Sequence, residues 1–129
     1  MPTGVTYRNA IAQQFETLAR SLIFYSGARP GVDAAATGTV LATIALPVDF
    51  MTAPSGGASS LAATVSDTSA DATGTLGYYR FVDGSGNVIK DGDCVTSGTA
   101  ADTMVFSSLA LAAGQQLNVT TFNFTVPAA

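Results

Sequence analysis

After Arg20 the sequence divides into short β-prone runs separated by clusters of Gly, Pro, Asp and Ser, and this pattern constrains the fold more than any other feature. Such an alternation is typical of β-sandwiches and barrels. We therefore predict a mainly β fold, a β-sandwich (jelly-roll-like or Ig-like) of about eight short strands. The predicted strands are Leu22–Tyr25, Thr39–Leu46, Leu61–Ser66, Thr75–Val82, Val88–Lys90, Cys94–Thr96, Met104–Ser107 and Leu117–Val126.

Two of these strands carry side chains that need an explanation. In the run 75–82, Tyr78 and Arg80 face one side of the sheet and Tyr79 and Phe81 the other, because side chains alternate along a strand. Since Arg is rarely buried without a partner, we expect one of these faces to point outward or into an interface. The last run changes the parity of its apolar positions, which indicates a bulge or a strand covered on both faces.

The N-terminal part of the chain has helical spacing instead. Apolar residues fall three or four positions apart and polar residues fill the other side, which predicts one amphipathic helix of about four turns, capped by Thr6. The apolar stripe consists of Tyr7, Ile11, Phe15, Leu18, Ala19 and Leu22. We therefore divide the chain into an N-terminal helical arm, residues 1–20, and a β-sandwich domain, residues 21–129.

Turn residues mark the connections between the predicted strands. The run Asp83–Asn87, with two glycines between β-prone segments, predicts a hairpin. It starts like a calcium loop, but Val88 and Cys94 stand where such a loop needs Gly and Glu. The polar, glycine-bearing stretches 54–60 and 66–74 predict exposed loops.

Charge is scarce and unevenly distributed. Only 11% of the residues are charged, against about 25% in typical domains. Residues 1–30 have a net charge of 3 − 1 = +2 and residues 31–102 of 2 − 8 = −6, while residues 103–129 have no charged side chain. The basic end and the acidic middle could pair between copies, against a larger partner, or only as solvated local groups. A charge-free segment with β-prone residues is aggregation-prone as a free edge strand, so we expect another protein to cover much of the surface.

The composition removes most catalytic chemistry. Without histidine, no Ser-His or Cys-His nucleophile and no His-ligated zinc site can form. The paired carboxylates of Asp91 and Asp93 and the amine of Lys90 have no flanking motif that points to catalysis or to a cation site. Cys94 is the only cysteine, and its apolar surroundings predict a buried, inert thiol. We expect no enzyme activity, no cofactor and no metal.

The sequence also predicts that neither nucleic acid nor a membrane is a partner. Five scattered cations form no phosphate-binding stripe. No run approaches the 18 or so consecutive apolar residues of a membrane span, and the first residues lack the apolar stretch of a secretory signal. We therefore expect synthesis in a cytoplasm.

Three segments follow the N-terminal helix: LIFYSGARPGVDAAATGTVLATIAL, GTLGYYRFVDGSGNVIKDG and TSGTAADTMVFSSLALAAGQQLNVTTFNFTVP. Together they resemble small structural proteins of tailed bacteriophage virions, especially capsid decoration or cement proteins. The resemblance covers the chain from about Leu22 to Pro127. It implies assembly rather than catalysis, synthesis in the cytoplasm of a bacterial host, and location on the capsid surface of a virion.

This resemblance implies the major capsid protein and copies of the chain itself as partners, in a homo-oligomer (trimer or dimer). The alternatives are a tail or baseplate component, or a host-surface or carbohydrate-binding module. We select interface candidates by their aromatic or basic side chains. They are Arg8, Phe15, Arg20, Tyr78, Tyr79, Arg80, Phe122 and Phe124.

Overall fold

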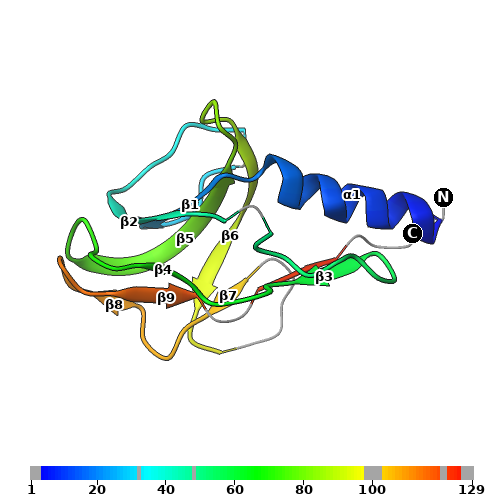
Figure 1. Ribbon diagram of the computed structural model, residues 1–129. Coiled ribbons are helices and arrows are strands. Elements are labelled where there is room, and N and C mark those ends of the chain that lie inside the picture. The colour runs from blue at the N-terminus through cyan, green and yellow to red at the C-terminus, as the bar shows by residue number, and fades with distance from the viewer. Residues whose placement is uncertain (1–3, 32, 48, 98–102, 120–121, 126–129) are drawn as a thin grey trace.

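The computed structural model describes residues 4–31, 33–47, 49–97, 103–119 and 122–125, with the backbone alone for residues 123–125 (Figure 1). Within these ranges it has one helix and a majority of strands among its elements, which confirms the mainly β prediction with an N-terminal helix. The elements are α1 Val5–Leu18, β1 Ser21–Ser26, β2 Val40–Ala45, β3 Ala58–Ser60, β4 Val65–Asp67, β5 Gly74–Val82, β6 Val88–Val95, β7 Met104–Val105, β8 Ala110–Leu111, β9 Leu117–Val119 and β10 Asn123–Thr125.

The first layer is a central sheet with the strand order β2-β1-β5-β6-β7. Its four longer strands pair antiparallel, and β7 joins β6 in parallel. Alternation along β1 and β5 directs Leu22, Phe24, Tyr79 and Phe81 into the core, where each is at most 1% exposed. The sheet therefore has one apolar face that a second layer must cover.

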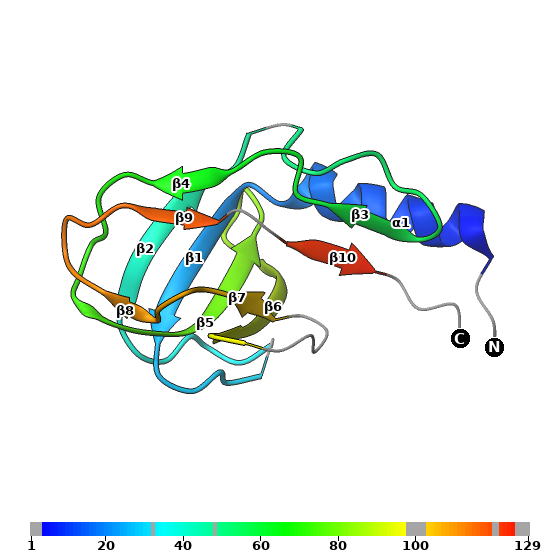
Figure 2. The same ribbon diagram turned by 90° about the horizontal axis from the view of Figure 1, so that it is seen from below.

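The second layer consists of short strand pairs. β4 pairs with β9 and β3 pairs with β10, whereas β8 belongs to the central sheet, where it pairs with the start of β5. Seen from below, β4 and β9 lie across β1 and β2 (Figure 2). The core between the layers includes Val65, Leu76, Met104, Leu111, Leu117 and Val119, with side chains from the central sheet. The arrangement is a sandwich, as the sequence predicts.

An aromatic cluster centred on Phe81 joins the helix to both layers. The Phe81 ring centroid lies 4.9 Å from that of Phe15, 5.0 Å from that of Phe122 and 5.5 Å from that of Tyr79. Phe50 adds a further ring at 6.2 Å. Since these rings come from distant parts of the chain, the cluster holds α1 against the sandwich.

The ends of α1 differ from the prediction. The N-cap is Gly4, no side chain caps the helix, and Thr6 lies inside its first turn, so the predicted Thr6 cap is wrong. The helix ends at Leu18. Leu22 does not continue the helical stripe because it pairs within β1 between β2 and β5.

The buried face of α1 is rotated from the predicted stripe. Ala12, Phe15, Glu16 and Ala19 are buried, whereas Tyr7 and Leu18 are exposed. The Glu16 carboxylate tolerates burial because it accepts hydrogen bonds from the Met51 amide, at 2.9 Å, and from the Gln13 side chain, at 2.9 Å. Glu16 is therefore buried beside Phe15 on the side of the helix that faces the sandwich.

The stretch 54–60, predicted as an exposed loop, is a hairpin seated on α1. Ser55 and Ala58 exchange backbone hydrogen bonds of 2.9 and 3.1 Å across Gly56 and Gly57, whose φ angles of 63° and 80° form the two-glycine turn favoured in hairpins. The Gly57 amide, which is buried, donates to Asn9 Oδ1 at 2.7 Å. Figures 1 and 2 show that α1, β3 and β10 project together from one end of the sandwich.

The hairpin predicted at Asp83–Asn87 is confirmed. The Asp83 carboxylate accepts hydrogen bonds from the amides of Ser85 and Asn87, both at 2.9 Å, and Gly86 adopts a φ of 85°. These bonds hold the pKa of Asp83 below its ordinary value, the Asn87 amide contributing most. The carboxylate is therefore part of the turn.

Strand boundaries differ from the prediction where strands are short. The predicted runs 88–90 and 94–96 belong to one strand, β6, and the predicted run 117–126 contributes to β9 and β10, which join different sheets. The apolar positions of that run change parity because the chain passes from one sheet, β4–β9, to another, β3–β10. The short strands β3 and β8 were not predicted, and β4 occupies only the end of the predicted run 61–66.

Candidate functional site

The loop that connects β1 to β2, described at residues 27–31 and 33–39, covers the face of the central sheet that is turned away from the core. Under this loop lie Tyr25, Tyr78 and Arg80, with exposed fractions of 9%, 0% and 3%. The shared face predicted for Tyr78 and Arg80 is therefore present. The chain's own loop covers this face, whereas we expected it to point outward or into an interface with a partner.

Two tyrosines anchor the end of this loop. The rings of Tyr25 and Tyr78 stack at 4.8 Å with an angle of 8° between their planes. The Tyr78 hydroxyl accepts a hydrogen bond from the Thr37 amide at 2.9 Å and donates one to the Thr37 carbonyl at 2.6 Å. Burial, and then the neighbouring Tyr78, raise the pKa of Tyr25, which keeps its hydroxyl protonated.

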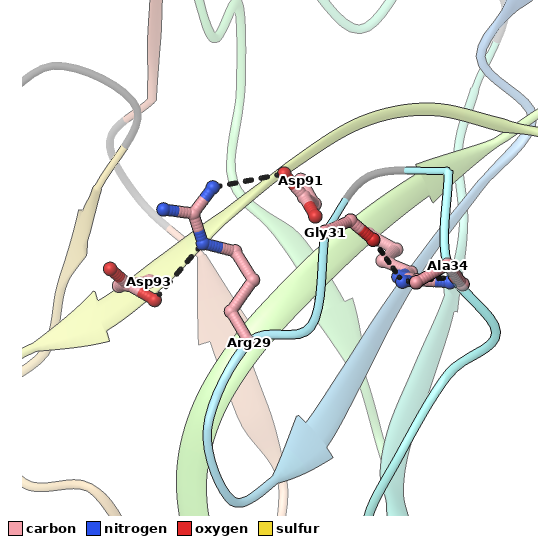
Figure 3. Close-up of polar contacts among 6 residues, drawn as sticks. Arg29, Gly31, Ala34, Asp91 and Asp93 are labelled. Atoms are coloured by element: carbon pink, nitrogen blue, oxygen red, sulfur yellow. Dashed lines mark hydrogen bonds and ion pairs between the residues drawn. The ribbon is translucent and has the colours of Figure 1, made fainter.

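Arg80 holds the middle of the loop through backbone carbonyls. Its Nη2 donates to the Gly31 oxygen at 3.1 Å and to the Ala34 oxygen at 2.8 Å (Figure 3). The guanidinium carbon lies 5.8 Å from the centroid of the Tyr78 ring, which is within cation–π distance. Main-chain acceptors and a ring thus replace water around this buried cation.

Arg29 brings the basic and acidic parts of the chain together. It contacts Asp91 through Nη1 at 3.1 Å and Asp93 through Nε at 3.3 Å (Figure 3). The hydrogen bond to Asp91 is the main cause of the raised pKa of Arg29. At this position the opposite charges pair within one chain. The distribution of charge along the sequence did not indicate whether they would pair within a chain, between copies or with a partner.

This polar cluster under and beside the loop fastens the loop to the sheet. Asp91 is 7% exposed, its Oδ1 is occupied by Arg29, and its Oδ2, like Arg80 Nε, makes no hydrogen bond within the described residues. In the part of the chain that the structure describes, no three His, Cys, Asp or Glu side chains are placed to hold a metal ion together. The arrangement therefore supports a structural role for the cluster.

A cleft opens on the opposite side of the molecule, between β7 and β9. Its volume is about 420 Å³, within the range of ligand sites in proteins. Leu76, Met104 and Leu117, all buried, contribute to its wall, and Ser107 and Asn118 contribute polar groups. Figure 2 shows β9 and β7 on the two sides of this region, with β8 at one end. We name it the β7–β9 cleft.

No charged side chain lines the β7–β9 cleft. Apart from Leu76, every lining residue lies between 104 and 119, within the segment 103–129 that carries no charge. The cleft therefore suits an uncharged occupant, because a charge placed there would have to shed water without gaining a partner. This is the candidate binding site of the molecule.

Cys94 points from β6 into the core and is buried. Burial, and secondarily the charge of Asp93, raise the pKa of its thiol from 9.0 to about 12. We therefore expect a thiol reagent at pH 8 to leave Cys94 unmodified in the folded chain and to label it in concentrated guanidinium chloride, because the thiolate is the reactive form. As a control, the variant Cys94→Ser with Ser97→Cys, whose new thiol is exposed, should react at once; equal rates would contradict the prediction.

The predicted interface residues are in different environments. Phe15, Tyr78, Tyr79, Arg80 and Phe122 are buried within the chain, at most 3% exposed, and so offer no surface to a partner in this structure. Phe15, Tyr79 and Phe122 belong to the aromatic cluster, and Tyr78 and Arg80 to the loop anchor. Arg8 is partly buried against Gly57 and Arg20 is exposed, while the side chain of Phe124 lies outside the described residues.

Sequence reasoning did not single out the β7–β9 cleft, although it flagged the segment that lines it. The absence of charge after residue 102 was the available signal. It did not reveal that two parts of this segment lie apart with an opening between them, because the pattern of a strand does not indicate which other strand it pairs with, here β6 for β7 and β4 for β9.

Within the described residues, no helix combines the length and hydropathy that a membrane span requires. Comparisons of the chain with protein-family models, with curated proteins and with solved structures found no match.

Proposed function

We propose that this chain is a non-enzymatic structural protein of a bacteriophage virion, a capsid decoration (cement) protein that binds the major capsid protein and copies of itself and stabilises the head. One observation supports this proposal most. Two exposed large apolar side chains lie on one side of the projecting helix: Tyr7 and Leu18, with exposed fractions of 65% and 42%. Apolar side chains gathered on one exposed element are typical of protein-binding surfaces.

The geometry of α1 suits docking without rearrangement. Tyr7 and Leu18 are eleven positions apart, about three helical turns, so they lie along one side of the helix with the half-buried Ile11 between them. The N-terminal half of α1 extends with β3 and β10 beyond the sandwich (Figure 2). A partner can therefore contact this side of α1, and the folded sandwich need not open.

The remaining surface favours close protein contact. Only 11% of the residues are charged, and the exposed connections are rich in Ala, Ser, Thr and Gly. Small side chains lose little conformational entropy on docking, and repeated copies on a symmetric lattice convert a modest contact into stable attachment. The resemblance to virion proteins, and to decoration proteins in particular, points the same way.

The variant Tyr7→Asp tests the docking role of α1. Asp in the first turn of a helix is compatible with folding because it faces the positive end of the helix dipole. We expect at least a tenfold lower copy number of the variant on purified heads, since the new charge would have to lose water at the interface. Quantitative mass spectrometry of particles assembled with each variant gives the copy number.

Thr6→Asp is the matched control, because Thr6 is exposed in the same first turn of α1 and lies about 100° around the helix from Tyr7. This variant should be incorporated like the parent chain. Normal occupancy by Tyr7→Asp would contradict the role of α1, and absence of the parent chain from purified particles would overturn the virion proposal. Recovery of the chain only in tails would replace the head assignment with a tail or baseplate one.

A further inference from the structure

The β7–β9 cleft is bounded by two strands, each with one neighbour. Among the described strands, β9 pairs only with β4, and β7 pairs only with β6. The edges that β7 and β9 turn toward the cleft are therefore not engaged in strand pairing within the described chain. A strand edge carries backbone donors and acceptors that can receive another strand.

The rest of the sandwich wall is continuous. On the far side of the β4–β9 pair, the Thr43 amide of β2 donates to Asp67 Oδ2 of β4 at 2.9 Å, and the Asp71 amide donates to the Leu41 carbonyl at 2.8 Å. The layers thus run from β9 through β4 to β2, across the central sheet to β6 and β7. The cleft is where this wall is interrupted, between the unpaired edges of β7 and β9.

The walls of the cleft have the alternation that a strand requires of its neighbour. In β9, Leu117 and Val119 are buried, whereas Asn118 is exposed. In β7, Met104 is buried and Val105 is exposed. An inserted strand with alternating side chains would place every second one over the core and the others in solvent, as strands of a sandwich do.

The chemistry of the cleft identifies the occupant. Its lining contains amides, hydroxyls and apolar groups and no charged side chain, so it disfavours any charged segment. The chain's own charge-free strands β7, β8, β9 and β10 are each paired within the chain already. A strand from a different protein is therefore the occupant that fits.

We propose that the β7–β9 cleft is a strand-addition site that binds an extended, uncharged segment of a partner protein. Main-chain hydrogen bonds to one or both edges supply affinity, and the alternate buried positions select small or β-branched apolar side chains. This inference goes beyond the virion role, because it holds for any partner that presents such a segment, and it involves a different surface from α1.

The test uses the full chain and a capped, uncharged heptapeptide that alternates Thr and Val. We expect the peptide to slow the hydrogen exchange of amides in β7 and β9 at least tenfold, with little change in α1, because added strand pairing protects edge amides. The same peptide with a central Pro, which cannot donate a backbone hydrogen bond, should lose this effect. A peptide with a central Lys should also lose it.

The variant Ser107→Glu places a charge at the cleft and should weaken heptapeptide binding at least tenfold. Ser85→Glu, on the exposed hairpin between β5 and β6, is the matched control and should bind like the parent chain. Thermal unfolding of both variants verifies that they fold. Equal binding of the Pro peptide, or protection by neutral oligosaccharides and not by the heptapeptide, would overturn strand addition. Protection that grows with the concentration of the chain alone would identify a second copy as the occupant and overturn the choice of a different protein.

Discussion

Replacing Phe81 with Ala is expected to lower the free energy of unfolding by about 3–5 kcal/mol, a large part of the roughly 5–15 kcal/mol that stabilises a typical domain. The side chain is 1% exposed and contacts rings from the helix and from both layers. Removing it leaves a cavity that the rigid sheet cannot close, and it loosens the packing of α1 through Phe15. Denaturant-induced unfolding followed by circular dichroism measures the loss.

Val105→Ala serves as the control for this measurement. Val105 also belongs to a strand, but its side chain is 51% exposed, so its truncation should change the free energy of unfolding by no more than about 0.5 kcal/mol. If both variants lost the same stability, the aromatic cluster would not be the centre of the core.

Gly77→Ala is expected to be comparably damaging for a different reason. A methyl group at this position would overlap the backbone carbonyl of Gly27 and approach the Gly27 nitrogen to 2.8 Å. The pairing of β1 with β5 shifts register next to Gly77, and the absent side chain lets the two backbones meet there. Because backbone cannot move aside as a side chain can, we expect a loss of about 3 kcal/mol or more in the free energy of unfolding.

Gly31→Ala is the matched glycine substitution. A methyl group at Gly31 meets nothing within 4 Å, and the residue does not adopt a positive φ. We expect this variant to equal the parent or gain up to about 1 kcal/mol, because Ala restricts the unfolded chain. A small effect of Gly77→Ala in the same unfolding experiment would show that β1 and β5 can separate at this register shift.

The longer strands could be predicted because their residues alternate or form β-branched runs. β1, β2 and β5 lie close to their predicted ranges, and the hairpin at Asp83–Asn87 follows from its turn residues. The short strands β3 and β8 could not be predicted, because they have only three and two residues and owe their conformation to the strand beside them.

The environment of Tyr78 and Arg80 was predictable only in part. Strand alternation correctly places both on one face, but the groups that cover them are main-chain atoms of Gly31, Ala34 and Thr37, which have no sequence signature. Side-chain chemistry therefore suggested an interface where a loop of the same chain supplies the partners. The cleft could not be predicted for a related reason, since it depends on the pairing of β7 with β6 and of β9 with β4, which the sequence pattern does not indicate.

The order of strand pairing has a consequence for how the chain acquires its fold. β7, β8, β9 and β10 each pair with a strand that precedes them in the sequence, namely β6, β5, β4 and β3. During synthesis, the apolar inner face of the central sheet thus remains partly uncovered until residues 104–125 have emerged from the ribosome. Pairings between residues far apart in the sequence form slowly, so the nascent chain passes through a state with an incomplete core. Chaperones can bind the apolar surface that this state exposes.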